Sequence, residues 1–195
     1  MVRVAAQAAY LIAIAGLVAL VAIGLFFADI SAFGPVNDLA LLAMTLALAP
    51  VMLGFYELGG RTPTGLARLA LVSGIAAVIG WSVLQALMIG GAVSFDYERG
   101  ATGAFAGEAV AVVVMGMWLS GANLLAGAWL TPLVRWLGVV AGIGFILFGL
   151  GLLLGGVSHP LTYAGGIGYQ ILFPIWAFLL GRRLTAIGES RGLAA

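Results

Sequence analysis

Residues 4–27 read VAAQAAYLIAIAGLVALVAIGLFF, a stretch without a single charged side chain. An α-helix needs about 20 apolar residues to cross a bilayer core of about 30 Å, so this stretch predicts a transmembrane helix. A secretory signal peptide has a shorter apolar run, of about 7–15 residues. The sequence ADISA that follows is a weak cleavage pattern. We therefore interpret the stretch as a retained helix.

Further along the chain, similar apolar stretches occur between charged residues, prolines and glycines. They cover residues 39–55, 66–90, 104–125, 136–156 and 163–181. Of the 195 residues, 64% are hydrophobic and 8% are charged, against about 45–50% and about 25% in a soluble domain. A soluble domain of this length cannot bury so much apolar surface. The sequence predicts an all-α integral membrane protein, with one domain of six transmembrane helices over residues 1–195.

The distribution of basic residues gives an independent test of this topology. With six spans, the two termini and the second and fourth loops lie on one side of the membrane. All but one of the eight basic residues fall there, namely Arg3, Arg61, Arg68, Arg135, Arg182, Arg183 and Arg191. Cytoplasmic loops carry such an excess. We therefore predict that both termini are cytoplasmic and that the membrane is a bacterial plasma (inner) membrane.

Several kinds of chemistry are excluded by composition. The chain has no cysteine, which removes disulfides and thiolate metal sites. Its basic residues are all arginine, so no lysine can form a Schiff base with retinal or pyridoxal phosphate. The single histidine, His159, cannot build a multi-histidine metal centre. We find no HExxH, GxSxG or P-loop motif. We expect no metal and no cofactor, and we lean away from an enzyme.

Polar residues inside the predicted spans are the main candidates for a site, because ionisable groups in a bilayer are costly. Glu108 lies near the outer end of the fourth span, where a helix dipole alone favours a carboxylate. The functional alternative is a group that binds a proton or a cation. Gln85, Tyr169 and Gln170 lie at similar depth, although buried amides also serve simply to join helices. If their faces converge, these four residues line a polar pocket open to the outside.

The loop before Glu108 carries an unusual concentration of charge. Asp96, Glu98 and Arg99 lie in it, and we expect it on the outer side, above the predicted pocket. Solvation of an ordinary loop is the simpler interpretation of these charges. His159 precedes Pro160 in another short outer loop, where it is either just solvated or a pH sensor, since histidine titrates near neutrality.

Glycine spacing indicates close helix packing. Gly138 and Gly142 are four residues apart, as are Gly151 and Gly155, and such spacing lets helix backbones approach closely in lipid. Packing inside the bundle and homodimerisation are both consistent with this pattern. The glycines and proline of the sixth span, YAGGIGYQILFP, indicate either a packing kink, since both residues are common in membrane helices, or a broken helix like those at transporter binding sites. With regular helical geometry, Tyr163, Gly166, Gln170 and Pro174 would share one face of that span.

The segment from Leu119 to Leu184 contains LTPLVRWLGVVAGI and FPIWAFLLGRRL. In these features the chain resembles a widespread group of bacterial multi-pass membrane proteins that is classed as a domain of unknown function. The resemblance implies a bundle of six or seven helices. It implies no reaction and no catalytic residue.

Two functions follow from these patterns. The first is a non-enzymatic structural or accessory component that packs through glycine-rich faces, against itself or a larger membrane complex. The alternative is a small oligomeric transporter or channel with Glu108 and Gln170 in its path. The expected partners are the lipid bilayer and other membrane subunits. Nucleic acid is not expected, because the net charge is only +1.

Overall fold

The structure is a computed structural model that describes residues 1–28, 31–59, 64–93 and 100–192. Helices make up most of it. They are α1 (Val2–Phe27), α2 (Gly34–Leu58), α3 (Thr64–Ile89), α4 (Gly103–Leu125), α5 (Pro132–Gly155), α6 (Pro160–Ile167) and α7 (Phe173–Ser190). A π-helical segment, Gly168–Leu172, joins α6 to α7.

Six helical segments of the described chain are long and apolar enough to cross a membrane. Five of them correspond to the helices α1, α2, α3, α4 and α5. The sixth runs from Pro160 to Ser190 through α6, the π-helical segment and α7. The prediction of an all-helical, multi-pass membrane protein is therefore confirmed. The last helix is longer than predicted, because it continues past Gly181 into a more polar stretch that ends at Ser190.

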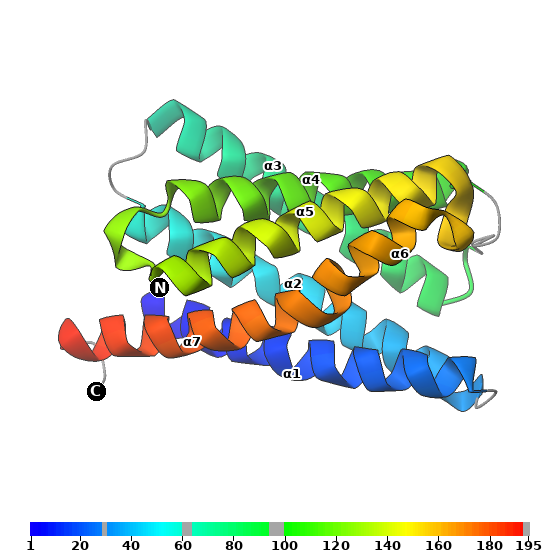
Figure 1. The fold of residues 1–195 in the computed structure, drawn as a ribbon, viewed down its shortest axis with the longest axis horizontal. Helices are drawn as coiled ribbons and strands as arrows, with labels where there is room; N and C mark the ends of the chain where they lie inside the picture. The colour runs from blue at the N-terminus through cyan, green and yellow to red at the C-terminus, as the bar shows by residue number, and fades with distance from the viewer. Residues whose placement is uncertain (29–30, 60–63, 94–99, 193–195) are drawn as a thin grey trace.

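The helices form a closed ring. Each of α1 to α5 packs against the next in the chain, and α7 returns to pack along α1. Both termini lie at the same end of the bundle (Figure 1), as an even number of crossings requires. We call this the terminal end, and the other the opposite end. The helices α1, α3 and α5, which precede the loops predicted to be outside, end at the opposite end.

Inside the ring, aromatic side chains fill the core. Trp81, Phe145 and Tyr169 pack in the half nearer the opposite end, with Phe145 and Tyr169 ring centroids 4.8 Å apart. Phe173 stacks on Trp176 at 5.5 Å and continues the core toward the terminal end. Their burial is nearly complete. The apolar residues on the outer surface, such as those of α1, are exposed as expected for contact with lipid.

Candidate functional site

A carboxylate and an indole meet between α3 and α4. Trp81 Nε1 donates a hydrogen bond of 2.9 Å to Glu108 Oε1. Glu108 lies about 8 Å inside α4, counted from Gly103 at 1.5 Å per residue. The first turn of α4 holds no acidic residue, and the helix dipole favours a carboxylate mainly within that turn. The helix dipole therefore does not account for the position of Glu108. The hydrogen bond from Trp81 satisfies only one of the two carboxylate oxygens.

Several polar atoms around this bond are buried without a hydrogen-bond partner among the described residues. They include Glu108 Oε2, Gln85 Nε2 and Tyr169 OH. Gln85 lies one helical turn beyond Trp81 on the same face of α3, and it is only 2% exposed. A buried polar group without a partner costs about 1–3 kcal/mol. Three such groups lie on α3, α4 and the last span.

Tyr169 reaches this region from the last span. Its ring lies 6.1 Å from that of Trp81 and 5.0 Å from that of Phe148. The side chain is 2% exposed, and its hydroxyl is buried without a partner among the described residues. Trp81 is therefore the residue that joins Glu108 to Tyr169.

The π-helical segment is what directs Tyr169 inward. Pro174 lacks the backbone N–H that would bond the carbonyl of Gln170 in an α-helix, and the chain instead forms a bond from the Phe173 N–H to the Gly168 carbonyl. This adds one residue to the turn and shifts the helical register. The predicted face of Tyr163, Gly166, Gln170 and Pro174 is consequently wrong: Tyr163 is 68% exposed, whereas Pro174 is buried.

The helix α2 contributes a further acidic side chain. Asp38 lies four residues after Gly34, the first residue of α2. Its neighbour Asn37 donates a long hydrogen bond of 3.4 Å to Asp38 Oδ1, while Asn37 Oδ1 is buried without a partner among the described residues. Asp38 and Glu108 thus both lie near the starts of their helices, α2 and α4.

Together these residues form what we call the polar cluster. It consists of Gln85, Glu108 and Tyr169, grouped around Trp81. Of the predicted pocket residues, Gln85, Glu108 and Tyr169 belong to it. Gln170 does not: it is only half-buried, and no hydrogen bond or ring contact described for the cluster involves it. Sequence analysis did not single out Trp81, although a tryptophan within a span, away from the interfaces where this residue collects, was a signal.

The remaining predicted residues lie elsewhere. Asp96, Glu98 and Arg99 fall outside the described residues. His159 lies at the N-terminus of α6, where its Nδ1 accepts a hydrogen bond of 3.3 Å from the Leu161 N–H. This interaction caps the helix, as a side-chain acceptor at that position does.

The glycines of α5 pack against helices of the same chain. A Cβ at Gly142 would lie 2.6 Å from the Ser120 nitrogen and 2.7 Å from the Gly116 carbonyl oxygen of α4. Gly138 faces the Asn123 side chain, also on α4, and Gly151 faces Thr162 of α6. A Cβ at Gly155 would meet the His159 ring at 3.1 Å.

Between the polar cluster and the terminal end, aromatic side chains fill the core of the bundle. Phe173 and Trp176 are completely buried. Trp176 Nε1 donates a hydrogen bond of 3.0 Å to Asn123 Oδ1, and Phe55 packs beside Trp176 and Trp118. We call this set the aromatic plug. It separates the polar cluster from the terminal end.

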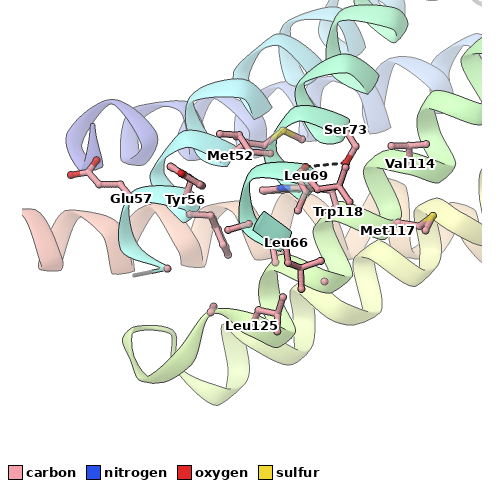
Figure 2. Close-up of a pocket in the computed structure, with 18 residues that line it drawn as sticks. Met52, Tyr56, Glu57, Leu66, Leu69, Ser73, Val114, Met117, Trp118 and Leu125 are labelled. Atoms are coloured by element: carbon pink, nitrogen blue, oxygen red, sulfur yellow. Dashed lines mark hydrogen bonds between the residues drawn. The ribbon is translucent and has the colours of Figure 1, made fainter. Parts of the chain in front are cut away.

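The structure contains two cavities that we describe, and neither is lined by Glu108, Gln85, Tyr169 or Gln170. One, of about 720 Å³, opens between α2, α3 and α4 near the terminal end (Figure 2). The other, of about 240 Å³, lies between the start of α1 and the end of α7, where Arg3 and Glu189 border it. Neither of these two cavities is therefore a polar pocket at the cluster that could hold an organic ligand.

Among the described residues, no group of three or more histidine, cysteine, aspartate or glutamate side chains could hold a metal ion. No family model, curated protein or solved structure matches this chain. The resemblance of residues 119–184 to a group of bacterial membrane proteins stays a prediction.

Proposed function

We propose that this protein is a small membrane transporter in which Glu108 binds and releases a proton. The observation that carries the proposal is the environment of its carboxylate, which is held by Trp81 inside a span while Oε2 is buried without a partner. Ionisable side chains at such depth mark ion pathways and proton relays in membrane proteins. A proton needs no cavity beyond a chain of hydrogen-bonding groups.

The neighbours of Glu108 have the chemistry of a relay. The Tyr169 hydroxyl both donates and accepts a hydrogen bond, and the Gln85 amide nitrogen is a donor. Both atoms are buried and free of partners among the described residues. Asp38 supplies a second acidic group near the start of α2. The proposed route runs from Asp38 to Glu108, with Tyr169 as the next group inward.

The last span provides an element that can change shape. It is interrupted by the π-helical segment that contains Tyr169, and interrupted helices at mid-membrane are typical of transporter sites. Release of the proton at the terminal end requires the aromatic plug to move. A rearrangement of Gly168–Leu172 would shift Phe173 and Trp176 together, because they follow directly in α7.

The accessory-protein alternative draws less support from the geometry. That hypothesis assumed glycine-rich helix faces that are available to a partner. In the structure, Gly138, Gly142 and Gly151 instead face α4 and α6 of the same chain. Six helices are few for a carrier, so the transport proposal keeps the expectation that the protein works as an oligomer.

Proton flux into proteoliposomes tests the proposal. Purified protein is reconstituted with a pH-sensitive dye inside, and a potassium diffusion potential drives protons inward. We expect acidification with the wild type, loss of it with Glu108→Gln, and retention with Glu57→Gln, a matched change at an exposed carboxylate. Equal flux through wild type, Glu108→Gln and protein-free vesicles would overturn the proposal.

A further inference from the structure

The larger cavity is a groove in the lipid-facing surface near the terminal end (Figure 2). Nearly all of its lining is apolar. The lining includes Met52 and Phe55 of α2, Leu66 and Leu69 of α3, and Met117 and Leu125 of α4. The hydroxyl of Ser73, a polar residue in it, already bonds the Ala70 carbonyl at 3.1 Å. The groove therefore offers apolar contact along its length.

The path of α3 creates this groove. At Gly74, α3 approaches α2 and α4 closely: a Cβ there would lie 2.9 Å from both Met52 Sδ and Trp118 Cδ1. From Gly74 back to its beginning, α3 diverges from the bundle, and Figure 1 shows its first turns standing apart from the ends of α2 and α4. Trp118, which is 6% exposed, also lines the groove.

The length of the groove identifies the class of occupant. On α4 it extends from Val114 to Leu125, which is about 16 Å at 1.5 Å per residue. A hydrocarbon core is about 30 Å thick, so the groove spans one leaflet. A transmembrane helix from a partner would cross both leaflets and would find a groove along only half its length. A single acyl chain from the leaflet at the terminal end matches the depth.

The mouth of the groove suits a lipid headgroup. Glu57, at the end of α2, lines it there and lies 3.8 Å from the N-terminal ammonium group. Arg68 lies on α3 between the lining residues Ala67 and Leu69, and it is exposed. A phosphate is attracted by such a guanidinium, and an ammonium group is attracted by the carboxylate. Both signs of charge thus occur where a zwitterionic phospholipid places its headgroup.

We propose that this groove is a binding site for a phospholipid, with one acyl chain between α3 and the α2–α4 surface and the headgroup at Arg68 and Glu57. The site is independent of the polar cluster, which lies in the other half of the bundle. A lipid held there fills the space under the diverging half of α3 and contacts the Trp118 ring.

Photo-crosslinking tests the site. The protein is placed in nanodiscs of phosphatidylethanolamine that contains a small share of a phosphatidylethanolamine with a diazirine in its acyl chain. Labelled peptides are then mapped by mass spectrometry. We expect labelling of α3 and α4 groove residues, such as Leu69 and Met117, above that of Ile143 and Leu154, which are exposed to bulk lipid on α5.

A matched pair of variants makes the test specific. Gly121 lines the groove, and a Cβ added to it meets nothing within 4 Å. Gly121→Leu should fill the groove and reduce its labelling to the level of bulk lipid contacts. Gly80→Leu has equal free space but lies on α3 outside the groove, and should leave labelling unchanged. Comparable melting temperatures for both variants exclude misfolding.

Two results would overturn the proposal. One is groove labelling no stronger than that of Ile143 and Leu154, or unchanged in Gly121→Leu, which would mean ordinary lipid contact. The other is protection of the groove by a second copy of the chain, seen as crosslinks between two protein molecules at Leu69 or Met117.

Discussion

Replacing Gly142 by alanine tests whether the α4–α5 contact is as close as the structure shows. The added Cβ would lie 2.6 Å from the Ser120 nitrogen and 2.7 Å from the Gly116 carbonyl oxygen. Both are backbone atoms, so no side-chain rotation relieves the contact and the helices must separate. Overpacking of this kind costs about 1–3 kcal/mol. Alanine recovers about 1 kcal/mol of helix propensity, which leaves a net destabilisation of about 0–2 kcal/mol.

Gly121→Ala on α4 is the matched control, because its Cβ meets nothing within 4 Å. It should gain helix propensity, up to about 1 kcal/mol, without a packing cost. The two variants should therefore differ by about 2 kcal/mol, or about 4–8 °C in melting temperature at about 2–4 °C per kcal/mol. Thermal unfolding in a mild detergent, followed by circular dichroism, measures the difference. A Gly142→Ala protein that melts at the same temperature as Gly121→Ala would refute the packing.

Three further substitutions separate structural from functional roles. Tyr169→Phe removes a buried hydroxyl without a partner among the described residues, so it should leave the melting temperature unchanged or raise it while reducing proton flux; a drop in stability with normal flux would contradict both expectations. Trp176→Phe leaves Asn123 Oδ1 without its donor and should cost about 1–3 kcal/mol in denaturant unfolding, whereas an unchanged midpoint would mean that the bond contributes nothing. His159→Ala removes the cap on the Leu161 N–H and should destabilise by about 0.5–2 kcal/mol, while His159→Asn restores an acceptor and most of that stability; equal melting of the two variants would rule out capping.

The membrane-spanning segments were predictable because they depend on composition over about 20 residues. Length and apolarity predicted all six, and the described helices begin and end within a few residues of several expected bounds. The second and last spans extend further, since α2 starts at Gly34 and α7 ends at Ser190. Polar residues at helix ends are tolerated in the interface, so hydropathy alone does not mark where the helix stops.

The internal geometry was less predictable. The depths of Gln85, Glu108 and Tyr169 could be read from their positions in the spans, but their facing depends on how six helices are rotated in the ring. The π-helical turn before Pro174 shifts the helical register of the last span. As a result, Tyr169 lies in the polar cluster and Gln170 does not. The bond from Trp81 to Glu108 joins two helices, and no spacing within one helix could indicate it.

Reaction of Glu108 with a hydrophobic carbodiimide tests the central claim most directly. Such a reagent modifies protonated carboxyl groups that lie within reach of the membrane interior. Labelling is measured in membranes over a range of pH, with mass spectrometry to locate the modified residue. The proposal predicts labelling at Glu108 that falls as the pH rises, is absent in Glu108→Gln and persists in Glu57→Gln. Absence of Glu108 labelling at every pH, in protein whose other carboxyl groups react, would contradict a carboxyl group that binds and releases protons.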